Sequence, residues 1–147
     1  MVRWQKLKLK VSTTGINALQ KKYERYGKEV VERSGDAAQS FVENVRDEYK
    51  SNARVDTGDL RRRTVAEIER SGVEIRASVY NNSDHVMFKE KGHMVRKGQL
   101  FYDKKSGTFK RVKQTRFIKG DHNFETAVRA HEKDFKKDML KAVKFHD

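Results

Sequence analysis

Asp56-Thr57-Gly58 is the segment of this 147-residue chain whose residue types most directly suggest chemistry. Asp-Thr-Gly is the catalytic triplet of aspartic proteases, in which two carboxyl groups share one proton. That chemistry needs the triplet at the end of a buried, apolar strand. Here the polar stretch Lys50-Ser51-Asn52-Ala53-Arg54 precedes it, and Arg61-Arg62-Arg63 follows soon after. The setting therefore favours a structural turn over a dimeric protease.

As a turn, the segment is the joint between a long helix and a sheet. Asp56 is placed to accept hydrogen bonds from the N–H groups that follow it, and Gly58 can take a positive φ. Leu60 then anchors the entering strand, and Arg61 to Arg63 face solvent or a partner. We expect a structural corner made of Asp56, Thr57, Gly58, Leu60 and Arg61.

Other reactive side chains do not form a recognisable catalytic or metal-binding pattern. A zinc site would need several histidines to converge, and no His-Glu-x-x-His spacing occurs. Glu48-Tyr49-Lys50 and Lys89-Glu90-Lys91 resemble halves of a metal-dependent nuclease site, but such triplets are usually solvated surface. We expect no catalytic residues, no metal and no cofactor. The histidines considered are His85, His93, His122, His131 and His146.

Composition narrows the class of protein. The formal net charge is +13, which implies an acidic partner such as nucleic acid, an anionic membrane or an acidic protein surface. The chain has no cysteine, so it can form neither a disulfide nor a thiolate site. Its first ten residues lack the apolar run of a signal peptide, and no segment approaches the roughly 20 apolar residues of a membrane-spanning helix. We expect a soluble protein made in the cytoplasm.

Two stretches predict amphipathic helices. Apolar residues recur every three or four positions from Ile16 to Tyr49, which predicts a helix over about 15–53 with one buried face. Gly35 costs a helix roughly 1 kcal/mol relative to alanine, so we expect a kink there, with a two-helix hairpin as the alternative. A stripe from Phe124 to Ala142 that includes His131 predicts a helix over 122–144, capped by Asp121.

Alternating patterns predict the strands. One strand is expected over 3–11, a hairpin over Thr64–Tyr80 that turns at Ser71-Gly72, and a second hairpin over Leu100–Val112 that turns at Lys105-Ser106-Gly107. Ala66 and Ile68 should share a face with Ala77 and Val79. The whole predicts a single α+β domain over 1–147. In it, a long kinked N-terminal helix and a C-terminal helix pack on a small antiparallel sheet, with a meander over 63–118.

The charge is concentrated in one segment. Residues 89–119 hold eleven Lys or Arg and two acids, interleaved with Phe101, Tyr102, Phe109 and Phe117. Such a pattern could stack bases and neutralise phosphates, or the aromatic side chains could face the core of the protein. The candidate face for DNA or a protein partner comprises Lys97, Lys104, Lys105, Lys110, Arg111, Lys113 and Arg116.

Four segments in order resemble the head–tail connector and tail-completion family of long-tailed phages. They are Val55–Arg61 after the long helix, Val79–Asn82 at a strand end, Phe88–His93, and Arg116–Phe124 leading into the last helix. The residues that match the family motifs are Glu90, Gly92, His93, Phe117 and Gly120. Val55 replaces the usual proline before Asp-Thr-Gly, and His85-Val86-Met87 replaces the usual aromatic-Ala pair.

The resemblance implies a non-enzymatic virion protein at the head–tail junction. Its implied partners are other phage neck and tail proteins and copies of itself in a ring, with the free protein a monomer and with DNA as a further contact. A membrane partner is not implied. The alternative left open by the residues is a basic nucleic-acid-binding module that uses the segment 89–119.

Overall fold

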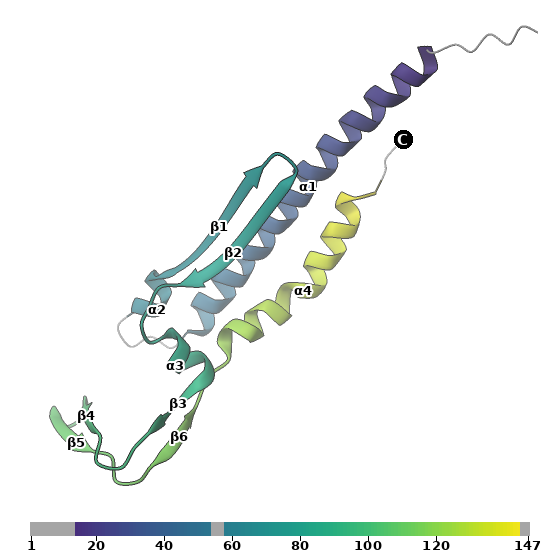
Figure 1. Ribbon diagram of the computed structural model, residues 1–147. Helices are drawn as coiled ribbons and strands as arrows, with labels where there is room; N and C mark the ends of the chain where they lie inside the picture. The colour runs from purple at the N-terminus through teal and green to yellow at the C-terminus, as the bar shows by residue number, and fades with distance from the viewer. Residues whose placement is uncertain (1–13, 54–57, 145–147) are drawn as a thin grey trace, which may run out of the picture.

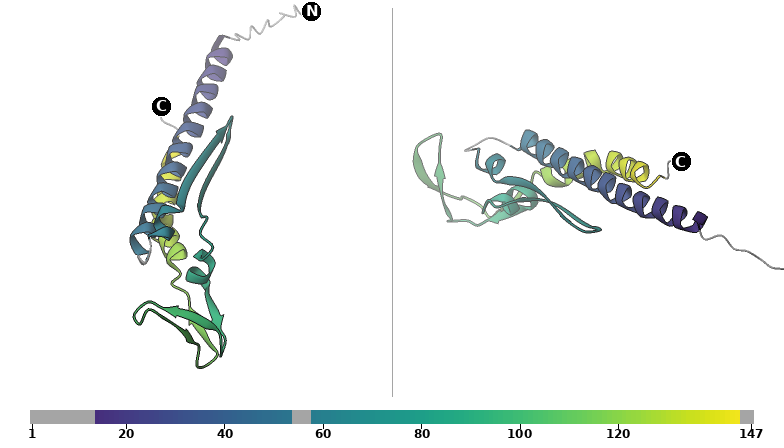
Figure 2. Two further views of the ribbon diagram at one scale, coloured as in Figure 1. Left: turned by 90° about the vertical axis from the view of Figure 1, so that its left-hand side faces the viewer. Right: turned by 90° about the horizontal axis from the view of Figure 1, so that it is seen from above.

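One long helix dominates the computed structural model, which describes residues 14–53 and 58–144. This helix, α1 (Thr14–Asn52), is continuous over 39 residues, Gly35 among them, and Figures 1 and 2 show it without a sharp bend. The two-helix hairpin considered for this stretch is therefore wrong, and the kink at Gly35 is not seen. The predicted strand over 3–11 lies outside the described residues.

The structure gives Gly35 a packing role. A side chain there would meet the guanidinium carbon of Arg70 at 2.9 Å. Arg70 comes from the first hairpin and donates hydrogen bonds to Asp36 at 2.9 Å and to Gln39 at 3.2 Å. The missing side chain therefore leaves room for an arginine to cross the helix, which offsets part of the cost of a helical glycine.

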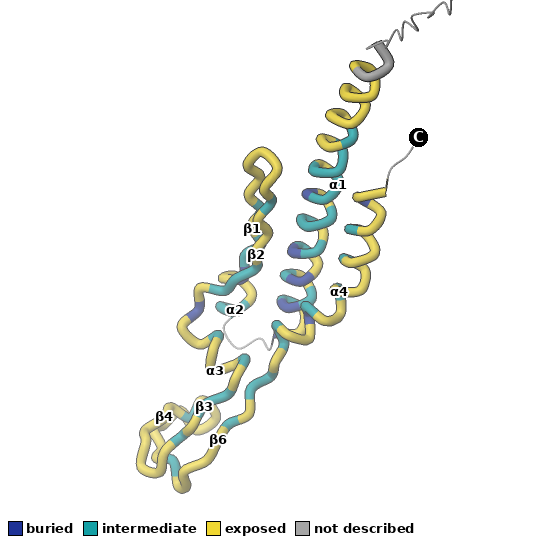
Figure 3. The backbone as a smooth tube through the Cα atoms, turned by 45° about the vertical axis from the view of Figure 1, so that its right-hand side comes forward, coloured by how far each residue is buried: buried dark blue, intermediate teal, exposed yellow. Residues whose placement is uncertain are grey.

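The second helix, α4 (Asn123–Ala142), lies along the C-terminal half of α1. Phe41 and Phe135 stack with ring centroids 4.5 Å apart. Tyr49 is 1% exposed and packs edge-on to Phe124. Burial therefore falls where the two predicted apolar stripes meet, as the dark segments of Figure 3 show. The first turns of α1 extend past α4, and Tyr23 there is 59% exposed.

The first hairpin has the predicted shared apolar face. It consists of β1 (Thr64–Ser71) and β2 (Glu74–Asn81), which pair antiparallel. Ala66 lies opposite Val79, and Ile68 lies opposite Ala77. Directly opposed residues share a face, so the expected apolar face is confirmed. The hairpin runs beside α1 (Figures 1 and 2).

Beyond this hairpin the chain leaves the helices. A short helix, α3 (Val86–Lys91), leads into β3 (Gly92–Val95), β4 (Leu100–Asp103), β5 (Thr108–Arg111) and β6 (Arg116–Lys119). β3 pairs with β6, and β4 pairs with β5. We call residues 92–119 the arm, and α1, β1, β2 and α4 the body. Figure 1 shows the arm extending beyond the end of the body.

The α+β class is confirmed, but the sheet is divided. The strands form three two-stranded ladders in place of one meander, because α3 intervenes after β2 and the chain turns away from the first hairpin. α3 was not predicted, since six residues are too few to display a helical period. Among the described residues no helix has the length and apolarity needed to cross a membrane.

Candidate functional site at the root of the arm

The corner after α1 is held by an arginine. Gly58 has φ 75° and precedes a single helical turn, α2 (Asp59–Arg62). Arg61 donates from Nη2 to the carbonyl oxygen of Ala53 at 3.1 Å, in the segment that ends α1. Its side chain therefore satisfies a carbonyl that the helix itself leaves without a partner. Asp56 and Thr57 lie outside the described residues, so their roles in the corner stay predictions.

A buried polar cluster fixes the same corner to the first hairpin. Thr64 is 2% exposed, and its hydroxyl donates to the carbonyl oxygen of Leu60 at 2.6 Å. Asn81 donates from Nδ2 to the Leu60 carbonyl and to Thr64 Oγ1, each at 2.7 Å. Ser83 Oγ donates to Asp59 Oδ2 at 3.2 Å. The sequence predicted Leu60 as an anchor for the strand. It did not predict that the Leu60 carbonyl, in α2, accepts the hydrogen bonds from both Thr64 and Asn81.

Glu90 joins the arm root to the last helix. Its carboxylate oxygen Oε2 accepts a hydrogen bond from the N–H of Phe124 at 3.0 Å, in the first turn of α4. The N–H of His122 also donates to the Glu90 carbonyl at 3.3 Å. A negative charge at a helix N-terminus is stabilising. The predicted cap at Asp121 is therefore wrong, because the residue that caps α4 lies 34 positions away along the chain.

Gly92 and Gly120 allow two backbone segments to touch. A Cβ on Gly120 would lie 2.1 Å from the carbonyl oxygen of Glu90. A Cβ on Gly92, whose φ is 81°, would lie 2.3 Å from the carbonyl oxygen of Ile118. Neither position has room for a side chain, and Gly92 also has a conformation that other residues rarely adopt. We call Glu90, Gly92 and Gly120 the clasp.

His93 and Phe117 lie on opposite faces of the β3–β6 ladder beside the clasp. His93 pairs with Ile118, and its ring contacts Phe88 edge-on with centroids 5.4 Å apart. Among the described residues its buried Nδ1 atom has no hydrogen-bond partner. The Phe117 ring packs over Gly92, yet it remains 58% exposed. The structure thus brings all five residues of the family motif to the arm root.

Tyr49, in the core of the body, has a pKa that is affected by two carboxylates at the root of the arm. Burial raises the pKa of its hydroxyl to about 12, and the carboxylates of Glu90 and Asp121 add to the effect. A buried neutral phenol beside two acids resists ionisation because the charged form would be both desolvated and repelled. The root of the arm is therefore electrostatically coupled to the contact between α1 and α4.

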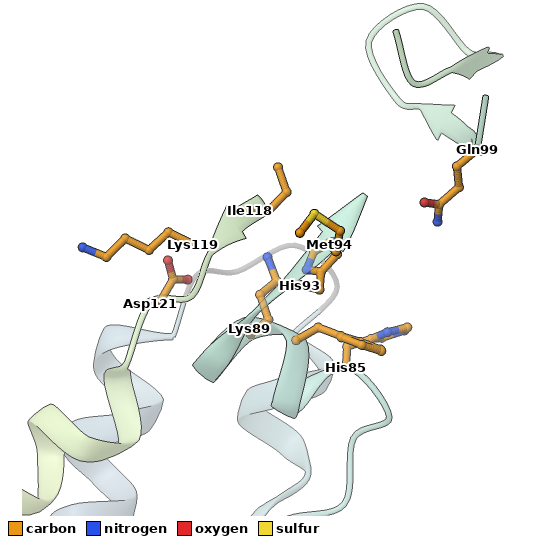
Figure 4. A pocket seen from close by; sticks show the side chains of 9 residues that line it. His85, Lys89, His93, Met94, Gln99, Ile118, Lys119 and Asp121 are labelled. Carbon is orange, nitrogen blue, oxygen red and sulfur yellow. The ribbon is translucent and has the colours of Figure 1, made fainter. Parts of the chain in front are cut away.

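A cavity of about 510 Å³ lies next to the clasp, with His85, Lys89, His93, Lys119 and Asp121 among its lining residues. Figure 4 shows that these side chains do not converge, since Lys119 extends away from the others and His85 points to the opposite side. Within residues 14–53 and 58–144 no group of three or more His, Asp or Glu could hold a metal ion. The titratable side chains that line the cavity are therefore spread around it and do not meet at one point.

The arm presents its cations to solvent. All seven residues of the predicted basic face are exposed. Four of them line a groove of about 590 Å³ together with Phe101, namely Lys110, Arg111, Lys113 and Arg116. Lys110 also pairs with Asp103. The hydrogen bond from that ammonium, followed by the one from the Ser106 hydroxyl, lowers the pKa of Asp103 to about 2.

The arm also exposes apolar side chains. In the β4–β5 ladder, Leu100, Tyr102 and Phe109 share one face, and Tyr102 and Phe109 meet edge-on at 5.3 Å. Phe109 is 71% exposed and Leu100 is 56% exposed. None of residues 92–119 is buried. Of the two arrangements considered for the aromatic residues, packing into the core of this chain is wrong.

Comparison with known proteins gives one match. Residues 17–92, just over half of the chain, match the HK97-gp10-like family model, described as "Bacteriophage HK97-gp10, putative tail-component". The matched region runs from α1 through the corner and the first hairpin to Gly92, and it ends where the arm begins. No curated protein and no solved structure matches the chain. The protein belongs to the HK97-gp10-like family of bacteriophage tail components.

Proposed function

We propose that the protein is a structural part of the virion that acts in tail completion or head–tail joining. It works by assembly with copies of itself into a ring and with other neck and tail proteins, and it is not an enzyme. It is made in the cytoplasm of the host bacterium and ends at the head–tail junction. Membership of a tail-component family supports this proposal.

The observation that carries the assembly step is the exposed apolar face of the arm. Leu100, Tyr102 and Phe109 are exposed on one face of a ladder of only two strands, a face that they share with Arg111. Exposed apolar patches of this kind mark interaction sites, and an isolated two-stranded hairpin is only marginally stable in water. The arm thus gains order when a partner covers this face.

A groove on the body offers the complementary surface on a second copy. It measures about 680 Å³ and lies between β2, α3 and α4, lined by apolar side chains that include Val79, Val86, Met87, Phe124 and Val128. Because the arm face and this groove are different surfaces, their contact is heterologous, and repetition about an axis closes a ring. The carbonyl of Leu60, in the corner, accepts hydrogen bonds from Thr64 and Asn81 and so holds the hairpin that forms one wall of the groove.

Removal of the gene from the phage genome that carries it tests the function. Electron microscopy of the resulting particles should show heads and tails that are not joined, and a plasmid-borne copy should restore joining. Joined, infectious virions without the protein would contradict the proposal.

A pair of variants tests the contact that closes the ring. Leu100→Ser with Phe109→Ser should abolish restoration by the plasmid-borne copy, because the apolar face is lost. Val73→Ser changes an apolar residue that is 85% exposed at the turn of the first hairpin, away from the arm, and should restore joining fully. Equal restoration by both variants would remove the arm face from the proposed contact.

A further inference from the structure

The net positive charge of this protein is concentrated in the arm, whereas the helices and the first hairpin are close to neutral. Residues 14–88 and 120–147 contain 19 basic and 19 acidic residues and are formally neutral. The arm contains nine Lys or Arg and one acid, Asp103. Asp103 is paired with Lys110, and the sequence of the arm has no other acidic residue. Within the described residues, the arm therefore carries nearly the whole net charge.

We propose that the arm binds the phosphate backbone of double-stranded DNA, without reading the base sequence. The groove lined by Lys110, Arg111, Lys113 and Arg116 includes no acidic side chain in its lining. Lys97 and Lys105 add exposed ammonium groups elsewhere on the arm. Cations that neutralise phosphates release condensed counterions, and this release is the main source of sequence-independent binding.

The distribution of the cations favours a polyanion over an acidic protein surface. They occur in the β3–β4 connection, the β4–β5 turn, β5, the β5–β6 connection and β6. A charge spread along the full length of a projecting ribbon suits a polymer that repeats a negative charge about every 1.7 Å of helix axis. A two-stranded ribbon also has the dimensions that the major groove of DNA admits.

This inference concerns the free protein and does not depend on ring assembly, so the two proposals can fail separately. Binding of the purified full-length chain to a labelled DNA duplex is measured by fluorescence anisotropy from about 50 to 200 mM salt, with two unrelated sequences. The logarithm of the binding constant should fall linearly with the logarithm of the salt concentration, and equally for both sequences.

Two variants with the same net charge decide where binding occurs. The arm variant combines Lys97→Gln, Lys105→Gln, Lys113→Gln and Arg116→Gln. The body variant combines Lys21→Gln, Lys28→Gln, Lys133→Gln and Lys137→Gln, all at exposed helical positions. The arm variant should lose about three to four units of salt slope, roughly one for each cation removed. The body variant should bind as the unaltered protein does. Both should keep the same thermal unfolding midpoint.

Four outcomes would overturn the proposal. An equal loss of DNA affinity in the arm variant and the body variant would show that binding depends on net charge and not on the arm. Tighter binding to a single-stranded oligonucleotide, lost on Phe101→Ala, would replace backbone contact by base stacking. Binding to polyglutamate with no binding to duplex DNA would identify an acidic protein as the partner. Binding that differs between the two duplex sequences would contradict the claim that bases are not read.

Discussion

Tyr49 and Tyr102 are the same residue type in opposite surroundings. Tyr49, in the body, is 1% exposed and packs on Phe124 of α4, whereas Tyr102, in the arm, is 54% exposed and contacts the ring of Phe109 on the neighbouring strand. The body buries its apolar side chains against itself. The arm presents apolar and cationic side chains that this chain does not cover. Stability is therefore concentrated in the body, and partner contacts are concentrated in the arm.

The largest expected difference in the free energy of unfolding is between alanine substitutions of these two tyrosines. Tyr49→Ala should lower the free energy of unfolding by about 3–5 kcal/mol, as loss of a buried aromatic ring does. Tyr102→Ala should change it by less than about 0.5 kcal/mol, because the removed ring is mostly exposed. Urea denaturation followed by circular dichroism measures both. A similar cost at the two positions would mean that the arm is part of the cooperative core.

A side chain at Gly120 should have the next largest effect. Gly120→Ala forces Cβ against the Glu90 carbonyl oxygen, a backbone overlap that should cost about 2–4 kcal/mol. Gly98→Ala is the matched control in the arm. Its φ of 88° is unfavourable for alanine, but the site is open, so its cost should stay near 1 kcal/mol. Equal unfolding midpoints for the two variants would show that the clasp does not restrain the body.

Loss of the Glu90 carboxylate should have a smaller effect. Glu90→Ala removes the acceptor for the Phe124 N–H, and loss of a helix cap typically costs about 1 kcal/mol. Glu32→Ala, at an exposed position of α1, should leave stability unchanged within about 0.5 kcal/mol. Backbone hydrogen exchange should also accelerate in the first turn of α4 only for Glu90→Ala. Unchanged exchange there would remove Glu90 as the cap.

The last expected effect is a dependence of stability on pH that is confined to alkaline solution. Because the folded pKa of Tyr49 is raised to about 12 from the usual 10, the folded state retains a proton that the unfolded chain loses. The contribution of Tyr49 is complete below pH 10 and is lost as pH rises from about 10 to 12. Tyr49→Phe should show a shallower loss of stability over that interval. Parallel curves of stability against pH for the unaltered protein and Tyr49→Phe would contradict the claim that burial raises the pKa of Tyr49.

Local patterns were sufficient to predict the elements of the body. The apolar stripes gave α1 and α4, and strict alternation gave β1, β2 and their shared apolar face. The second hairpin was predicted by its turn residues. The continuity of α1 at Gly35 could not be predicted, because Arg70 fills the space beside Gly35 and comes from a strand 35 positions later. Propensity alone therefore overstated the effect of a glycine.

The candidate site was harder to predict than the fold. The family motif named Glu90, Gly92 and Gly120, but nothing local reveals that Glu90 reaches Phe124 or that the two glycines meet. Such contacts depend on how α3 turns the chain, and α3 is too short to show a period. The segregation of charge was visible in the sequence, whereas exposure of the aromatic side chains required the structure.

The most direct test of the division between body and arm is replacement of residues 96–115 by a short glycine-rich turn, which retains the clasp and the β3–β6 ladder. The purified variant should keep the helical circular dichroism and the unfolding midpoint of the unaltered protein. In the phage, electron microscopy should show heads and tails that fail to join. Normal joined virions from this variant, with the body folded, would contradict the claim that the arm is the element through which the protein acts.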